Sequence, residues 1–334
     1  MFNPTRKITK VSLPMAKPAA MVIALLALTG CGGGGSDNAA PTPATATFGL
    51  QISDAPVDEA AAVVVCFSSI ELVGNGSATQ KYLIGSDAVA AAPNNLCTNA
   101  QGNIIANSRG IDLLKLPGAT AESLVSGATV SAGNYGQLRL VISEGSYIQL
   151  KDGSKKALTV PSNELKLLGP TLSAGGTFNY TLEFDLRKAI VNNKAGQNYQ
   201  LKPTGLRLVD TSQIGHLTGV VSETLLLNNQ CTVAPADKTK PVGVVYLYKG
   251  ADLAAATLAD YGGTQPNQPY ASAPVLFDGA GNYPYEIGFI DAGTYTAAFT
   301  CKTADDPEAA DMVTFLLTKT QVIQANKTPA VLNF

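Results

Sequence analysis

Four carboxylates crowd into residues 305–311, and they are the side chains of this sequence best suited to hold a metal ion. They are Asp305, Asp306, Glu308 and Asp311. Ca²⁺ takes about six to eight hard oxygen ligands, often from carboxylates and carbonyls of loops, and the oxygen-rich turn that begins at Asp278 could add to them. Because the spacing is not that of an EF-hand, a solvated acidic loop is the simpler interpretation, and calcium is the hypothesis to test.

Paired carboxylates are also the groups with which a glycosidase works, one as acid and the other as base or nucleophile. Glu183 and Asp185 share one face of a predicted strand, and Asp54, Asp58 and Glu59 lie close together in the sequence. A solvated strand face accounts for the first pair. A turn, in which Asp54 bonds its own backbone before a proline, accounts for the second set. An envelope hydrolase that acts on carbohydrate is therefore kept only as the alternative function.

The sequence contains one histidine, His216, so a Ser-His-Asp triad or a Cys-His pair has no other base to use. No serine lies in a G-x-S-x-G turn, and zinc catalysis would need several histidine or cysteine ligands. His216 directly precedes an apolar strand, and we interpret it as a structural or solvated residue. The sequence thus predicts no catalytic residues, and we expect that the protein is not an enzyme.

Alternating side chains show which elements must position these groups. In residues 178–187 the apolar and polar side chains alternate, with Phe178, Tyr180 and Leu182 on one face and Glu183 and Asp185 on the other. This period of two is typical of a half-buried strand. Similar alternation recurs at 63–67, 138–142, 242–248 and 295–301, and Gly, Asn and Asp turns separate the runs. The pattern predicts an all-β fold of two tandem antiparallel β-sandwich domains, residues 47–210 and 215–334.

Little helix is expected, with 253–260 and 121–125 as the best candidates. The sequence contains one short internal similarity, which we call the internal echo. Ala132-Gly133-Asn134-Tyr135 precedes one predicted strand, and Ala292-Gly293-Thr294-Tyr295 opens another. Glycine permits the turn and the tyrosine can pack across the start of the strand. The match is short, so we interpret it as one device that two sandwiches share rather than as a duplication.

Four cysteines lie in the two predicted domains, Cys66 and Cys97 in the first and Cys231 and Cys301 in the second. An even number in an exported protein indicates disulfides, although four cysteines allow three pairings. Pairing within each domain needs no bond between domains, and we expect Cys66–Cys97 and Cys231–Cys301. Cys301 falls on the apolar face of its predicted strand, which places that disulfide in the core.

The first residues are typical of an export signal. Four cations without an acidic residue precede the apolar run 19–28, which is too short to span a bilayer. The run ends in Leu28-Thr29-Gly30-Cys31, which resembles the bacterial lipobox. The resemblance implies that residues 1–30 are removed as a signal peptide and that Cys31 receives a diacylglycerol and a further acyl chain such as palmitate. Gly32 in place of aspartate implies sorting to the outer membrane.

Residues 31–46 are rich in Gly, Ser, Pro, Thr and Ala, and they form a predicted flexible linker behind the anchor. Loss of residues 1–30 removes four cations, so Lys plus Arg falls from 23 to about 19 against 25 acids, a net charge of about −6. Nucleic acid as a partner is excluded on this charge, because phosphate contacts need clustered Lys and Arg.

Six motifs occur in one order between residues 47 and 210 and carry a resemblance to a family. They are Ser53-Asp54-Ala55-Pro56-Val57-Asp58, Gly110-Ile111-Asp112-Leu113-Leu114, Ala132-Gly133-Asn134-Tyr135 with Leu138-Arg139-Leu140, Val160-Pro161-Ser162, Phe184-Asp185-Leu186-Arg187-Lys188 and Leu201-Lys202-Pro203. Together they resemble the bacterial lipoprotein family called domain of unknown function 4382. The resemblance implies a β-domain of the cell envelope and brings no catalytic residues.

Residues 215–334 resemble the transthyretin-like sandwich that accompanies carboxypeptidases as a regulatory-like domain. The resemblance rests mainly on the start of the strand at Gly293-Thr294-Tyr295, and the segment 224–240 has no counterpart in the simplest members. Such modules are usually accessory and non-catalytic. We therefore expect a lipid-anchored envelope protein, on the periplasmic or outer surface, that serves as a binding or structural module. A glycan or an envelope protein remains open as the ligand.

Overall fold

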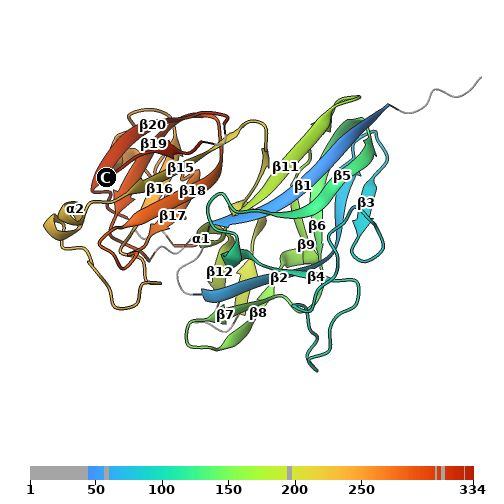
Figure 1. Ribbon diagram of the computed structural model, residues 1–334, viewed down its shortest axis with the longest axis horizontal. Coiled ribbons are helices and arrows are strands. Elements are labelled where there is room, and N and C mark those ends of the chain that lie inside the picture. The colour runs from blue at the N-terminus through green and yellow to red at the C-terminus, as the bar shows by residue number, and fades with distance from the viewer. Residues whose placement is uncertain (1–43, 56–59, 194–197, 305–306, 310–312, 327) are drawn as a thin grey trace, which may run out of the picture. The chain divides into compact units, whose positions relative to one another are not determined.

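The computed structural model describes residues 44–55, 60–193, 198–304, 307–309, 313–326 and 328–334, and residues 43–334 form one compact unit. Two groups of sheets share this unit, one built from residues 45–210 and the other from 214–331 (Figure 1). We call them the first and the second sandwich. No strand of one group pairs with a strand of the other in the described part of the chain. The all-β fold with two sandwiches agrees with the sequence-based expectation.

A four-stranded sheet, ordered β14-β11-β1-β5, forms one layer of the first sandwich. Its strands are β1 (Thr45–Ala55), β5 (Glu122–Ser131), β11 (Thr177–Asp185) and β14 (Leu206–Asp210). β1 pairs with β11 in parallel, from Thr47 opposite Thr177 to Ala55 opposite Asp185, whereas the other neighbours are antiparallel. The sequence did not predict this parallel pair, because alternation within a strand carries no information on the direction of its neighbour.

The second layer of the first sandwich is a ten-stranded sheet with the main order β10-β6-β2-β7-β8-β13-β12. β3 and β4 pair with β2, and β9 pairs with β6. The bounds are β2 (Ala60–Gly74), β3 (Gln80–Leu83), β4 (Arg109–Asp112), β6 (Gly133–Ile142), β7 (Tyr147–Leu150), β8 (Lys155–Thr159), β9 (Glu164–Leu168), β10 (Thr171–Leu172), β12 (Ile190–Asn193) and β13 (Asn198–Leu201). Phe48, Phe67, Tyr135, Leu140 and Phe184 are among the buried side chains that fill the space between the layers.

The second sandwich pairs a three-stranded sheet, β18-β15-β21, with a four-stranded one, β17-β16-β19-β20. The bounds are β15 (Ile214–Val220), β16 (Gly243–Lys249), β17 (Ala271–Val275), β18 (Pro284–Asp291), β19 (Gly293–Thr300), β20 (Leu317–Ile323) and β21 (Ala330–Val331). Both faces of β16 are buried: Val245 and Leu247 join the main core of this sandwich, and Tyr246 and Tyr248 join a second cluster with Tyr261. The tyrosines of this strand thus belong to the core.

Short helices fill the connections. They are α1 (Leu186–Ala189), α2 (Glu223–Asn228) and the 3₁₀ turns η1 (Leu113–Lys115), η2 (Pro161–Asn163), η3 (Pro203–Gly205) and η4 (Ala255–Thr257). The described residues contain no helix that is long and apolar enough to cross a membrane. α2 begins at Ser222, whose hydroxyl accepts a hydrogen bond from the amide of Leu225, as an N-cap does.

Both expected helices are wrong. Residues 121–125 run into strand β5, because Val125 pairs with Leu50 of β1 and both side chains enter the core. Residues 253–260 contain only the turn η4, because the amide of Ala259 bonds the carbonyl of Asn267 rather than one in its own segment. In both cases partners from distant parts of the chain take the backbone groups or side chains that would have stabilised a helix.

The two tyrosines of the internal echo make the same contact. Tyr135 donates its hydroxyl proton to the carbonyl of Ser131, and Tyr295 donates to the carbonyl of Asp291, each at 2.8 Å. Each bond ties the corner at which the chain leaves one sheet of its sandwich for the other, from β5 to β6 and from β18 to β19. This is the arrangement of a tyrosine corner. The interpretation of one device that two sandwiches share is confirmed.

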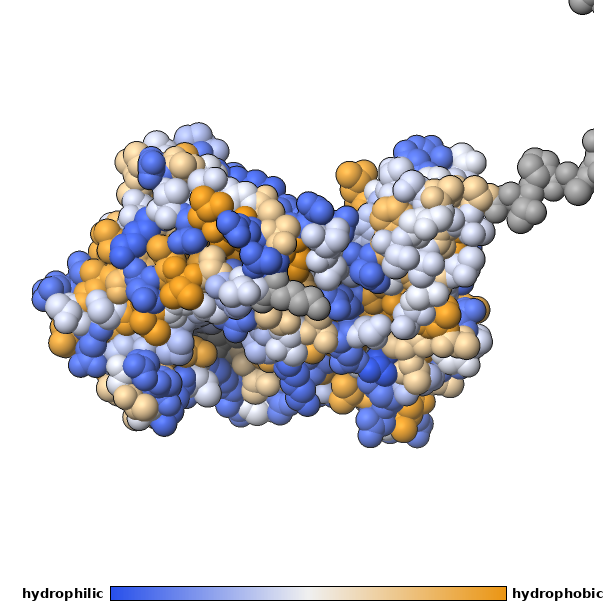
Figure 2. All heavy atoms as spheres, turned by 45° about the horizontal axis from the view of Figure 1, so that its top comes forward, coloured by the Kyte–Doolittle hydropathy of each residue, from blue (hydrophilic) through white to orange (hydrophobic). Residues whose placement is uncertain are grey.

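Several bulky apolar side chains are exposed to solvent. On the face drawn in Figure 2, hydrophobic residues form separate patches that hydrophilic residues divide. The largest exposed fractions among the bulky apolar residues belong to Leu168 at 84%, Val331 at 65% and Ile104 at 61%. These three lie on different elements, so each needs an explanation of its own.

We predict that Tyr135→Phe and Tyr295→Phe each lower the free energy of unfolding by about 1 kcal/mol, because each removes the donor of a carbonyl at a buried corner. Urea denaturation of the folded unit measures the change. Tyr147→Phe is the matched control, since the Tyr147 hydroxyl makes no hydrogen bond within the described part of the chain and its ring lies under the Lys155 ammonium. Equal losses in all three variants would show that the corners contribute nothing specific.

Candidate functional site

The connection between β3 and β4, residues 84–108, is the longest segment of the first sandwich without a regular strand or helix, and we call it the 84–108 loop. Figure 1 shows it projecting away from the strands beside β4. Cys97 in its middle pairs with Cys66 of β2, with a Cα–Cα distance of 5.8 Å and both side chains fully buried. This is the pairing expected from the sequence. Loops of this length without secondary structure are commonly functional.

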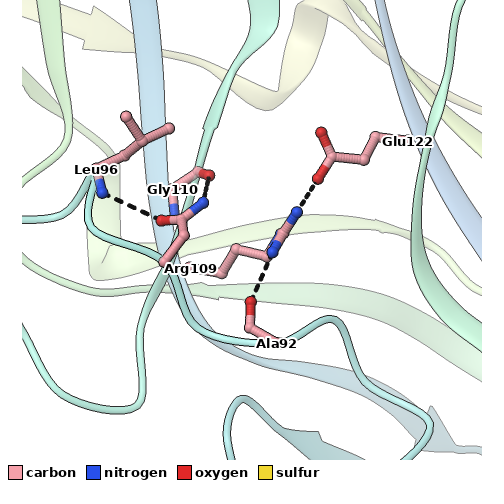
Figure 3. Close-up of polar contacts among 6 residues, drawn as sticks. Ala92, Leu96, Arg109, Gly110 and Glu122 are labelled. Carbon is pink, nitrogen blue, oxygen red and sulfur yellow. Dashed lines mark hydrogen bonds and ion pairs between the residues drawn. The ribbon is translucent and has the colours of Figure 1, made fainter.

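The Asn94 side chain attaches the first half of the loop to β4. Its Nδ2 donates to the carbonyl of Gly110 at 2.6 Å, and its Oδ1 accepts from the amide of Gly110 at 3.0 Å. Oδ1 also accepts from the amide of Leu96 at 3.2 Å, as Figure 3 shows. One amide side chain therefore bonds both backbone groups of Gly110, as a neighbouring strand would.

Arg109 and Gly110 complete this attachment at the start of β4. Arg109 donates to the carbonyl of Ala92 at 2.6 Å and forms an ion pair with Glu122 of β5 (Figure 3). A Cβ on Gly110 would lie 2.6 Å from the Cβ of Leu96 and 2.9 Å from the sulfur of Cys97, so only glycine fits there. This close contact explains why glycine stands first in the Gly110-Ile111-Asp112 motif, a role that the sequence alone did not show.

The tip of the loop is a small closed hairpin. Thr98 and Ile104 form an isolated β-bridge, and the Asn99 carboxamide oxygen accepts from the amides of Gln101 and Asn103, each at 3.0 Å. Gly102 turns the chain with a φ of +81°, a conformation typical of glycine. The tip is thus held by its own hydrogen bonds and presents Ile104 to solvent.

The part of the loop that follows Asp87 is neutral. Residues 88–108 contain no charged and no aromatic side chain, and they include five asparagines and one glutamine. A neutral surface of this kind offers shape, amide hydrogen bonds and apolar contact for recognition, and no charge to attract a partner. Because the loop is already fixed, binding through it costs little conformational entropy. Sequence analysis did not find this site, because the asparagines that build it form no recognisable motif.

The second cysteine pair lies at the edge of the second sandwich. Cys231 and Cys301 have a Cα–Cα distance of 5.6 Å, in agreement with the expected pairing. Cys301 was expected inside the core, but it follows the last residue of β19, Thr300, and is only partly buried. Both cysteines still pack against the main core of this sandwich. The pair therefore attaches the connection after α2 to the end of β19.

Most of the proposed calcium ligands cannot be placed. Asp305, Asp306 and Asp311 lie outside the described residues, as does Cys31. Glu308 is described, and it forms an ion pair with Lys202. Asp278 uses its carboxylate within its own turn, and hydrogen bonds from Asn282 and from backbone amides lower its pKa. The calcium hypothesis stays a prediction, and the Asp278 carboxylate accepts the hydrogen bonds that close its own turn.

The acid pair on β11 is buried rather than solvated, which corrects the interpretation made from the sequence. Glu183 and Asp185 are each 1% exposed. Tyr261 of the second sandwich donates a hydrogen bond to the Asp185 carboxylate, and Arg207 of β14 lies directly opposite Glu183. Arg207 in turn donates to the carbonyl of Tyr270 at 2.9 Å. Residues from both sandwiches thus cover a polar sheet face that alternation alone marks as exposed.

Burial decides the protonation of these acids. It raises the pKa of Glu183 to about 8, although the charge of Arg207 and a hydrogen bond from Ser53 act in the opposite direction. Burial also raises the pKa of Asp185, against the hydrogen bond from Tyr261. Neither carboxylate oxygen of Asp54, on the neighbouring strand, has a hydrogen-bond partner among the described residues. Burial, followed by the charges of Glu183 and Asp185, raises the pKa of Asp54 well above the usual range. Closed off from solvent, these acids do not form a cleft in which a sugar could bind.

His216 is structural, in line with the interpretation from the sequence. It is 8% exposed and lies at a β-bulge between β15 and β18, where its Nδ1 accepts from the amide of Phe289 at 3.3 Å. Phe289 has a φ of +47°, which is rare for a bulky residue. Burial lowers the pKa of His216, against the charge of Glu286, so the neutral ring that can accept this bond is favoured.

We predict that Glu183→Gln makes the protein more stable than the unmodified chain at pH 8 to 9. Between pH 4.5, the ordinary pKa of the group, and about pH 8, Glu183 keeps its proton in the folded state but loses it in the unfolded chain. The contribution of Glu183 to the free energy of unfolding is therefore full at low pH and is lost as the pH rises through that window. Gln cannot ionise, and the gain is on the order of 5 kcal/mol at most. Urea denaturation from pH 5 to 9 measures it.

Glu144→Gln, at an exposed position, is the control for this substitution. It should leave the slope of stability against pH unchanged. The same slope for the Glu183→Gln variant and the unmodified chain would show that Glu183 does not hold its proton in the folded state.

The first sandwich matches one known protein family. The family described as Domain of unknown function (DUF4382) matches residues 45–203, and no curated protein matches the chain. Among solved structures, a leucine-rich repeat protein of Bacteroides thetaiotaomicron is 13% identical with a TM-score of 0.21, and the match covers 87% of this chain and 26% of that one. This chain thus spans about a quarter of the length of that protein.

A candidate cell adhesion protein of Parabacteroides distasonis is 11% identical with a TM-score of 0.17, and 85% of each chain is covered. TM-scores this low do not indicate a shared fold. The family match, in contrast, spans the ordered motifs from Ser53 to Pro203 and nearly all of the first sandwich. The chain therefore contains a DUF4382 domain at residues 45–203.

Proposed function

We propose that this protein is a non-catalytic module of the cell envelope that a lipid on Cys31 holds at the outer membrane and that binds an envelope protein through the 84–108 loop. The observation that carries the proposal is the loop itself. A disulfide, the Asn94 side chain and Arg109 fix this long segment to the sheet, and its residues 88–108 carry no charge. Its tip leaves Ile104 61% exposed.

A protein partner is favoured over a glycan. Sugar-binding surfaces use aromatic side chains as apolar platforms, and residues 84–108 contain none. The asparagine amides of the loop can hydrogen-bond the polar backbone of a protein partner, and the aliphatic side chain of Ile104 can contact apolar side chains of that partner. The alternative of a hydrolase finds no support in the acids it would use, since Glu183 and Asp185 lie under the second sandwich.

The anchor and the second sandwich belong to the same proposal. The order of basic residues, apolar run and Cys31 supports lipidation, and the linker that follows ends at β1, which begins at Thr45. The corner at Tyr295 and the pair of sheets support an accessory role for residues 214–334, similar to that of transthyretin-like modules. We assign this half the task of supporting the first sandwich, which presents the loop.

We predict that Cys31→Ser abolishes metabolic labelling of the protein with palmitate, because no sulfur remains to accept the lipid. Labelling and membrane fractionation of cells that express the full chain measure this. Gly32→Asp is the matched variant: it should stay labelled and move from the outer to the inner membrane fraction. Palmitate on the Cys31→Ser protein would rule out the anchor.

We predict that a photo-crosslinking residue in place of Ile104 captures a discrete protein in intact cells, whereas the same residue in place of Leu168 does not. Leu168 is 84% exposed on the same sandwich and serves as the control for accessibility. Replacing both Cys66 and Cys97 with alanine should abolish the adduct, because the tip loses its attachment. Equal adducts at both positions, or glycan-array binding without a protein adduct, would contradict a protein-binding loop.

A further inference from the structure

The outer face of the sheet β18-β15-β21 carries a groove that lies apart from the 84–108 loop. Its volume is about 530 Å³, within the range of sites that bind small ligands or single side chains. Thr218 of β15 lies between Glu286 of β18 and Val331 of β21, and Val220 lies opposite Pro284. Because side chains alternate along a strand, Tyr285 points into the core while these residues face outward.

The walls of this groove are apolar. Val220 is 39% exposed and Val331 is 65% exposed. Pro117, which precedes β5, and Pro274 of β17 lie along the sides, together with Pro284. Proline offers no backbone N–H, so these walls suit aliphatic chains better than polar groups. An exposed apolar surface of this kind typically marks a site of interaction.

A single negative charge lies in the groove. Glu286 is the one charged residue that lines it, in the part of the chain that the structure describes. Its Oε1 accepts a hydrogen bond from the amide of Ala119 at 2.9 Å. No lysine or arginine forms an ion pair with it among the described residues. The carboxylate is therefore held in place by a backbone amide while its charge remains uncompensated.

We propose that this groove binds a lysine or arginine side chain of an extended partner segment, with aliphatic residues on either side of it. Charge complementarity selects this occupant: the ammonium or guanidinium group meets Glu286, and its methylene stem lies along the prolines and valines. A neutral aliphatic side chain would leave Glu286 without a counterion, and an acidic one would be repelled. This inference does not depend on the 84–108 loop.

The test uses residues 43–334 with ¹⁵N labels and three blocked peptides, acetyl-Val-Lys-Val-amide and its norleucine and glutamate analogues. The lysine peptide should shift the amide signals of Thr218, Val220 and Val331 at millimolar concentration. The norleucine peptide should bind about threefold more weakly, in keeping with one solvent-accessible ion pair. The glutamate peptide should not bind.

Glu286→Gln is the matched variant, because its amide oxygen can still accept from Ala119 while the charge is gone. It should bind the lysine and norleucine peptides equally. Val331→Thr should weaken both peptides alike, since it changes the apolar wall only. Equal affinity of the unmodified protein for the two peptides, no shifts at all, or shifts confined to the 84–108 loop would overturn the groove proposal, and the last result would leave the proposed function standing.

Discussion

The polar face of β11 is buried beneath Tyr261 and Tyr270, and the rest of the structure depends on this contact. Glu183, Asp185 and Arg207 would be solvated if the first sandwich were alone, because they point away from its core. The hydroxyl of Tyr261 and the carbonyl of Tyr270 replace part of the lost water. Burying ionised carboxylates is costly, so burial raises the pKa of both acids, while the charge of Arg207 acts in the opposite direction.

Close backbone approach supports the same arrangement. A Cβ on Gly288 of β18 would collide with the carbonyl of Gly118, and a Cβ on Gly118 would collide with the Glu286 carboxylate. The absence of side chains at both positions lets the chain before β5 lie directly against β18, where Glu286 accepts from Ala119. The contact thus combines buried polar groups with a tight apolar fit, and neither sandwich supplies it alone.

Side-chain hydrogen bonds replace strand pairing at the places where this chain leaves its sheets. Asn94 bonds both backbone groups of Gly110, and Tyr135 and Tyr295 each bond a carbonyl at a corner between two sheets. A buried polar group without a partner is costly, so these residues help to fix the conformation of the chain where it leaves regular strand pairing. The 84–108 loop gains its rigidity in this way, which is what a binding surface requires.

The sequence by itself predicted most of the strands, favoured the observed cysteine pairs and singled out the two tyrosines at the starts of strands, because each of these depends on local spacing. Alternation marks residues 178–185 as a strand whatever lies around them, and an even set of cysteines divided between two halves favours local pairs. The ordered motifs also identified the DUF4382 domain over nearly the extent that was later matched.

Only the tertiary structure decided which faces are buried, which strands run parallel and which loop and groove we propose as binding surfaces. Glu183 and Asp185 look like a solvated face until Tyr261 covers them, and residues 121–125 look helical until Leu50 takes Val125 as its partner. Asn94, Ile104 and Glu286 carry no local signal of their roles. The physical reason is that burial and unpaired charge depend on contacts between distant residues, and a local pattern does not contain these.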